Sequence, residues 1–234
     1  MSIIIPAVLP KSREDLESSL SRLALIERVE TVQIDVVDGH FARPATWPYA
    51  GSALWELPRS ERFRFDLDLM VTDPGEAVDQ WVALGATRVT LHAESVTNLP
   101  HLVASFEKKY GHEAGFTPAL LSLGLAFGIE TDLAAIEPYV QKVDYIQFMG
   151  IAHIGRQGEP FDRRVLLKIR SFRARHPNIV IQVDGGVSLH TASDLFAAGA
   201  DRLIVGSALM KADNIEAEIT KFEALGEKYG MYER

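Results

Sequence analysis

The stretch VQIDVVDGHF, residues 32–41, carries an amide and a carboxylate inside an otherwise apolar run. Side chains alternate between the two faces of a β-strand, so Gln33 and Asp35 share one face while Val32, Ile34 and Val36 share the other. Polar groups are costly to bury without partners. The polar face of this segment therefore predicts a site that needs oxygen atoms.

Other apolar runs end in the same way. FDLDLM, LHAE and QVDGG each bring acidic, amide or imidazole side chains to one face near the end of a predicted strand. We expect these groups to collect at one mouth of the fold; they are Gln33, Asp35, Asp66, Asp68, His92 and Asp184. Any single aspartate is also consistent with a turn or a cap.

As a set, these carboxylates predict a bound cation. Several like charges in one mouth of low dielectric repel each other unless a cation or protons intervene. Carboxylate and amide oxygens are hard ligands, which suit Mg²⁺ or Mn²⁺ better than a histidine-rich zinc site. The sequence therefore predicts a divalent metal ion, with Mg²⁺ or Mn²⁺ favoured over Zn²⁺.

Three glycine-bearing loops, at 155–159, 184–187 and 205–209, follow the sixth, seventh and eighth predicted strands. In parallel barrels, the loops after the last two strands often bind phosphate through backbone N–H groups and a helix N-terminus. Each loop alone reads as a turn, but their spacing predicts a phosphate site, with Arg156 adding charge at its rim. The candidate phosphate-binding residues are Gly155, Gly158, Gly185, Gly186, Gly206 and Ser207.

Short apolar runs alternate with longer amphipathic ones along the chain. The predicted strands cover 3–9, 32–37, 63–71, 87–92, 121–127, 144–150, 179–185 and 201–206. The predicted helices lie near 13–28, 50–58, 73–84, 97–110, 131–139, 162–175, 188–198 and 211–226. Eight strands, each followed by a helix, favour a single (β/α)8 barrel over residues 1–234, with function at the C-terminal ends of the strands.

Composition excludes several classes of function. The chain has 234 residues, 24 Lys and Arg against 32 Asp and Glu, and no cysteine. Disulfides, thiolate catalysis and cysteine zinc sites are thereby excluded, and without a basic cluster we expect no nucleic-acid or membrane partner. The N-terminal segment lacks the pattern of a signal peptide, and no apolar run is long enough to span a bilayer, so we expect a cytoplasmic protein.

With these residues in place, the chain resembles the ribulose-phosphate 3-epimerase family over nearly its whole length. The resemblance is carried by IDVVDGHF (34–41), DLDLMVTDP (66–74), VTLHAES (89–95), VDGGV (183–187) and AGADRLIVGSAL (198–209). It implies a (β/α)8 barrel, a sugar-phosphate substrate and a barrel that associates into homo-oligomers.

The resemblance also implies a mechanism and roles for particular residues. A ketose phosphate is inverted at the carbon beside its ketone: Asp35 and Asp184 act as the acid–base pair, the intermediate is an enediolate, and a divalent metal ion stabilises that enediolate. The metal-ligand positions correspond to Gln33, Asp35, Asp68 and Asp184. Gly185, Gly186, Gly206 and Ser207 match the phosphate grip of the family, and Met70 and Met149 match its apolar floor.

The sequence departs from the family at several of these positions. Gln33 and Asp68 stand where the family has its two histidine ligands, and Ala7 and Pro10 replace two serines. The loop AHIGRQGE replaces an Asn-Pro-Gly-Phe-Gly-Gly type of sequence, and Gly-Ile replaces Asn-Pro at 128–129. These changes bear on the choice of metal and of sugar.

Two histidines remain as candidates for the substrate pocket. His92 ends the fourth strand and His153 follows the sixth, and each is equally consistent with a hydrogen-bonded structural role. Three functional hypotheses follow. The first is an epimerase that acts on a ketose phosphate other than, or besides, ribulose 5-phosphate. The second is a decarboxylase or aldolase on the same barrel, which the absence of a lysine at any predicted strand end disfavours. The third is a catalytically weak relative that binds a sugar phosphate as a sensor or partner.

Overall fold

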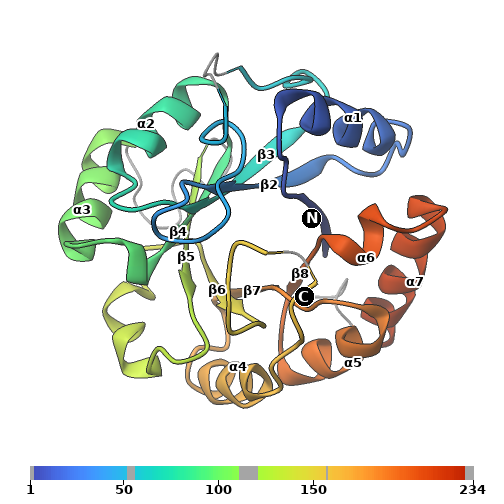
Figure 1. Ribbon diagram of the computed structural model, residues 1–234. Helices are drawn as coiled ribbons and strands as arrows, with labels where there is room; N and C mark the ends of the chain where they lie inside the picture. The colour runs from blue at the N-terminus through green and yellow to red at the C-terminus, as the bar shows by residue number, and fades with distance from the viewer. Residues whose placement is uncertain (1–2, 52–55, 111–120, 157, 230–234) are drawn as a thin grey trace.

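The computed structural model describes residues 3–51, 56–110, 121–156 and 158–229, and its centre is a closed barrel of parallel strands paired in chain order. The helices ring the barrel from outside (Figure 1). The strands are β1 Ile4–Val8, β2 Thr31–Val37, β3 Arg64–Met70, β4 Arg88–His92, β5 Ser122–Phe127, β6 Tyr145–Met149, β7 Val180–Asp184 and β8 Arg202–Val205. The predicted (β/α)8 barrel is confirmed. The prediction that residues 1–234 form one domain stays a prediction.

Helices follow most of the strands, as the alternating pattern predicts. They are α1 Arg13–Leu23, α2 Gly75–Ala83, α3 Leu99–Tyr110, α4 Arg164–Arg175, α5 Leu189–Ala198, α6 Ser207–Met210 and α7 Ile215–Lys228, with 3-10 turns η1 Ala93–Ser95, η2 Leu133–Ala135 and η3 Glu137–Tyr139. Helix α5 begins where the Ser188 side chain accepts the N–H of Thr191 and ends at Gly199, whose φ is 109°. In the described part of the chain, no helix has the length and apolar character that crossing a bilayer requires.

Two predicted helices are wrong. The segment 131–139 forms the separate turns η2 and η3, because Pro138 lacks the N–H that a continuous helix would need there. In the segment 50–58, residues 50–51 and 56–58 form bends, turns and irregular chain, while 52–55 lie outside the described residues. Pro58 restricts the residue before it to extended conformations, which also opposes a helix.

The main apolar core lies between the barrel and its helices. The outward faces of the strands, such as Phe65, Leu67 and Leu69 of β3, are fully buried in this core. The helices contribute buried aromatic residues such as Trp81 and Phe172, and Phe172 packs against Phe148 of β6. The inward faces are different, because they carry amides, carboxylates and guanidinium groups where barrels usually hold branched apolar residues. Alternate side chains of each strand therefore face the apolar core outside the barrel and the polar interior inside it.

The lower layer of this interior is a charged cluster. Asp66, fully buried, lies 3.1 Å from Nη1 of Arg88, whose guanidinium lies 4.5 Å from the ring centre of Tyr145. Gly124 makes room for that ring, since a Cβ at this position would lie 2.1 Å from Tyr145 Cε2. The expectation that Asp66 joins the mouth of the barrel is therefore wrong: its charge is compensated by Arg88 in the lower layer.

Candidate active site

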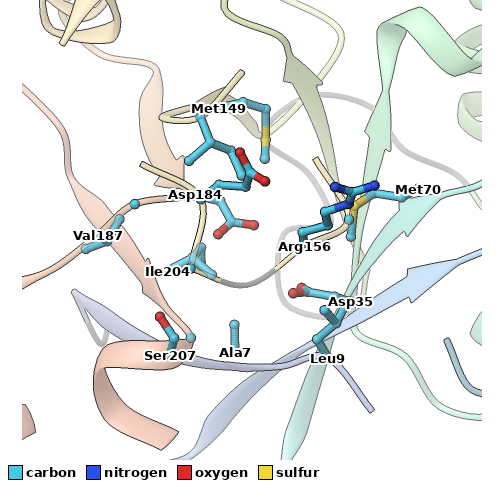
Figure 2. Close-up of a pocket in the computed structure, with 17 residues that line it drawn as sticks. Ala7, Leu9, Asp35, Met70, Met149, Arg156, Asp184, Val187, Ile204 and Ser207 are labelled. Carbon is cyan, nitrogen blue, oxygen red and sulfur yellow. The ribbon is translucent and has the colours of Figure 1, made fainter. Parts of the chain in front are cut away.

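The carboxylates of Asp35 and Asp184 face one cavity at the C-terminal end of the barrel. Asp35 lies on β2 and Asp184 ends β7, and both carboxylates point into the cavity from different walls (Figure 2). Below them, the Gln33 amide nitrogen donates to Asp35 Oδ1 at 2.8 Å and to Asp184 Oδ2 at 3.1 Å. One amide group thus holds the two carboxylates at a fixed separation.

Their surroundings favour the protonated forms of both acids. Burial, together with the negative charges of Asp184 and Asp68, raises the pKa of Asp35 well above its usual range. Burial and the charge of Asp68 raise the pKa of Asp184 to about 7. Carboxyl groups with a pKa near the working pH can both accept and return a proton, which is what acid–base catalysis requires.

Asp68 lies beside these two acids but has its own partner. Its Oδ1 is 3.0 Å from Nε2 of His92, and its Oδ2 accepts from the Gln147 amide at 3.3 Å. Burial opposes a charge on His92, but the Asp68 carboxylate outweighs it and raises the pKa of His92. The two side chains therefore form a buried, hydrogen-bonded pair inside the barrel.

Together, Asp35, Asp68 and Asp184 form a triad that could hold a metal ion. One oxygen of each carboxylate lies within 4.8 Å of the others. The nitrogen of Gln33, and not its oxygen, faces this triad. The carboxylate oxygens are hard donors and fit a divalent cation. In this geometry Gln33 adds no further oxygen to the set.

Backbone at three loops forms another wall of the cavity. Gly185 has a φ of 93° and Gly186 a φ of 66°, a region that favours glycine. Neither position has room for a Cβ: at Gly185 it would lie 2.6 Å from Ile151 Cγ1, and at Gly186 it would lie 2.8 Å from Phe161 Cα. The predicted phosphate-binding residues all line this cavity; they are Gly155, Gly158, Gly185, Gly186, Gly206 and Ser207.

The rest of the lining is apolar, apart from two charged side chains. The space at this end of the barrel, including its open mouth, is about 550 Å³, which suits a small metabolite. The apolar lining residues are Ala7, Leu9, Met70, Met149, Ile151, Val187 and Ile204. Arg156 supplies a positive charge and Glu159 a further carboxylate. Arg156 lies on the same side as Met70 and Asp35, across the cavity from Ser207 (Figure 2).

A sequence model of the ribulose-phosphate 3 epimerase family matches residues 3–210. The chain belongs to this family. Ribulose-phosphate 3-epimerase of Schizosaccharomyces pombe is 28% identical over 218 residues, covering 93% of this chain and 90% of the relative. The enzyme of the same name from Aquifex aeolicus is 28% identical over 200 residues, covering 84% of each chain. These relatives are isomerases that act on carbohydrates.

Solved structures support the fold alone. KGPDC from Streptococcus mutans superposes with a TM-score of 0.67 at 11% identity, covering 98% of this chain and 99% of that one. The 3-hexulose-6-phosphate synthase from Salmonella typhimurium superposes with a TM-score of 0.68 at 18% identity, covering 97% and 100%. Barrels with this arrangement therefore occur in proteins of differently named activities.

Within this epimerase-family barrel, the predicted site residues fall at different depths. Asp35, Asp184, Met70 and Met149 line the cavity together with the loop glycines. Another group lies beneath the cavity and is fully buried or nearly so: Gln33, Asp68 and His92. His153 is not among the lining residues; its side chain is 78% exposed and lies 3.4 Å from Glu159.

Sequence reasoning missed part of the polar interior. Arg88 and Gln147 were not predicted as residues of the barrel interior. Each lies at an inward-facing position of a buried strand, two residues from another inward-facing side chain. Gln182 belongs to the QVDGG stretch and shares the face of Asp184, but it was not among the predicted site residues. The signal that could have found all three is a polar side chain at every second position of a run whose intervening residues are apolar.

Proposed function

We propose that this protein is an epimerase of ketose phosphates that inverts the carbon next to the ketone. The observation that carries the proposal is the pair Asp35 and Asp184. Their carboxylates come from separate strands, face one cavity and have raised pKa values. Two such groups can flank a planar intermediate, so that a proton leaves one face and returns to the other.

The reaction needs both acids. One carboxylate accepts the proton from the carbon beside the ketone, and the electrons of the broken C–H bond form the enediolate. The other carboxyl group donates a proton to the opposite face of the same carbon, which inverts it. Gln33 holds the two acids through its shared N–H bonds, and the apolar walls at Met70 and Met149 exclude water from the intermediate.

The family uses a divalent metal ion, and the triad of Asp35, Asp68 and Asp184 fits one. When bound, such an ion supplies stabilisation of the negative charge that develops on the enediolate oxygens. We propose Mg²⁺ or Mn²⁺ rather than Zn²⁺, because the donors are carboxylate oxygens. The predicted ligand Gln33 would join this set only if its amide were turned over.

The phosphate of the substrate is assigned to the glycine loops. Backbone at Gly185, Gly186 and Gly206 lines the cavity with Ser207, and Arg156 adds a charge opposite them. The sugar phosphate itself is the partner that the site predicts. Ribulose 5-phosphate is the first substrate to test because the relatives are named for a ribulose phosphate. Association into homo-oligomers and a cytoplasmic location stay predictions.

The test is proton exchange in D₂O. Ribulose 5-phosphate and other ketose phosphates are incubated with the protein and Mg²⁺, Mn²⁺ or Zn²⁺, and deuterium at C3 is followed by NMR. Incorporation together with the inverted sugar would support the proposal. Binding of a sugar phosphate without exchange under any metal would refute it and favour a binding protein. Carbon–carbon cleavage would favour the decarboxylase or aldolase, although no lysine is among the residues that line the cavity.

A further inference from the structure

A chain of side-chain hydrogen bonds runs beneath the cavity, from the lower layer of the barrel toward the carboxylates. Arg88 Nη2 donates to Gln182 Oε1 at 2.7 Å. Gln182 Nε2 donates to Gln147 Oε1 at 2.7 Å, and Gln147 Nε2 donates to Asp68 Oδ2 at 3.3 Å. The two glutamines are fully buried. The chain therefore links Arg88 to the triad without passing through solvent.

The direction of this chain is fixed at its lower end. A guanidinium group has donors and no acceptor, so only the oxygen of Gln182 can face Arg88. The nitrogen of Gln182 must then point the other way, toward the oxygen of Gln147. That leaves the nitrogen of Gln147 for Asp68. The orientation of each amide follows from Arg88 and does not depend on the protonation of any carboxyl group.

A branch of the same chain reaches the acid–base pair. Gln182 Nε2 lies 3.5 Å from Gln33 Oε1, at the long end of hydrogen bonding, and Gln33 Nε2 then donates to both Asp35 and Asp184. A carboxyl group offers an acceptor oxygen in either protonation state, so the upper end of the branch is compatible with the orientation that the lower end sets. The two ends agree on which atom of Gln33 faces the acids.

We propose that Arg88 and Gln182 are positioning residues that orient the amides of Gln33 and Gln147, so that both present N–H donors to the carboxylates of the site. This inference rests on the proposed function and adds to it. It assigns Gln33 as a donor that holds Asp35 and Asp184 in register for proton transfer. It removes Gln33 from the metal-ligand set.

Space filling does not account for this arrangement. Apolar side chains of similar volume would fill the barrel without the cost of burying amides. A buried polar network is stabilising only when its members are satisfied. Both ends of the Gln182 amide have partners, as do both ends of Gln147. A positioning role requires that the hydrogen bonds run in one direction, donor to acceptor, from Arg88 to the acid–base pair, and they do.

The experiment compares Gln182→Glu with the wild type. The variant keeps the shape of the side chain and the bond from Arg88 but has no N–H, so Gln147 must turn its nitrogen toward residue 182. Its oxygen would then face Asp68. We expect kcat for C3 exchange to fall by about 10- to 100-fold, because a donor to a charged group is lost, while KM stays unchanged. Gln141→Glu, the same change at an exposed position, is the control.

A second measurement is independent of activity. Neutron diffraction from deuterated crystals locates amide deuterons directly. In the wild type we expect the Gln33 deuterons between Asp35 and Asp184, and in Gln182→Glu we expect the Gln147 deuterons to face residue 182. Gln182 Nε2 also lies 3.5 Å from Asp66 Oδ2, so Gln182→Glu adds a negative charge beside a buried carboxylate. Gln182→Met removes the polarity without adding charge and should also lower kcat.

The outcomes separate this inference from the proposed function. Wild-type deuterons of Gln33 directed away from the acids would overturn the inference, as would an unchanged kcat in a folded Gln182→Glu. A kcat that falls only in proportion to the folded fraction would show that the chain of hydrogen bonds has a structural role alone. If the wild type exchanges no ketose phosphate, the proposed function fails, and the neutron structure still decides the orientation of the amides.

Discussion

Gly186 offers a direct test of the phosphate site. It lines the cavity after β7, its φ is 66°, and its carbonyl oxygen accepts from Thr191 Oγ1 at 3.1 Å. The substitution Gly186→Ala adds one methyl group where backbone occupies the space. A Cβ would lie 2.8 Å from Phe161 Cα and 2.9 Å from Phe161 Cβ. Phe161 backbone cannot rotate away as the end of a flexible side chain would.

The magnitude follows from two separate costs. A left-handed backbone costs a residue with a Cβ about 1–2 kcal/mol relative to glycine. Carbon atoms pack best at about 3.5–4.0 Å, so the loop must move by roughly 0.7 Å or more, and overpacking of this kind costs about 1–3 kcal/mol. The summed loss of stability is about 2–5 kcal/mol. Displacing an N–H that binds phosphate should weaken phosphate binding by about 10- to 100-fold.

Gly85→Ala is the matched control. Gly85 has a φ of 97°, and a Cβ there meets nothing within 4 Å, so this variant carries the conformational cost without the steric one. Gly85 lies in the turn after α2, away from the cavity. Urea unfolding gives the free energy of unfolding, and calorimetric titration with inorganic phosphate gives the affinity. Phosphate affinity in Gly186→Ala equal to that of Gly85→Ala would refute the assignment of this loop to phosphate.

Three further predictions concern the charges of the site. In metal-free protein, the pKa of Asp184 is raised from 3.8 to about 7, so the folded state holds a proton that the unfolded state has released; stability should fall as pH rises through this window, and Asp184→Asn should flatten the slope in thermal melts. Asp35, whose pKa is also raised, leaves a smaller slope in the variant, and a slope equal to that of the wild type would contradict the assignment. Arg156→Gln should weaken phosphate binding by about fivefold at low salt and less at high salt, while Arg156→Lys retains most of it; equal affinities at low salt would exclude this role. Asp68→Asn should lower Mn²⁺ affinity, measured by electron paramagnetic resonance on folded protein, by more than about tenfold. An unchanged affinity would remove Asp68 from the ligand set.

The barrel could be predicted closely from the sequence. Each predicted strand agrees with the structure to within one residue at either end, for example 63–71 against Arg64–Met70. The reason is physical: the outward faces are apolar because they pack on helices, and the loops between them are marked by glycine, proline and aspartate. The failed helices lie where proline interrupts the chain, and there hydrophobic periodicity alone was misleading.

The sequence predicted which polar residues face the barrel interior better than it predicted the layer in which each one lies. Asp66 and Asp68 share one face of β3, and nothing in their local sequence separates them. A strand rises about 3.3 Å per residue, so two residues separate them by more than 6 Å along the barrel. That distance puts Asp66 beside Arg88 and Asp68 beside His92. The register between strands, which decides these neighbours, depends on pairing around the whole barrel and is not encoded in any one strand.

The roles that we propose for the cavity residues would let an acidic site take an anionic substrate. The chain has a formal net charge of −8, and Asp35, Asp184 and Glu159 all line the cavity, so the overall field repels a phosphate. Backbone N–H groups attract an anion without adding a titratable charge, and they lie on the loops after β7 and β8. The anion is therefore held without a further titratable cation beside the acid–base pair.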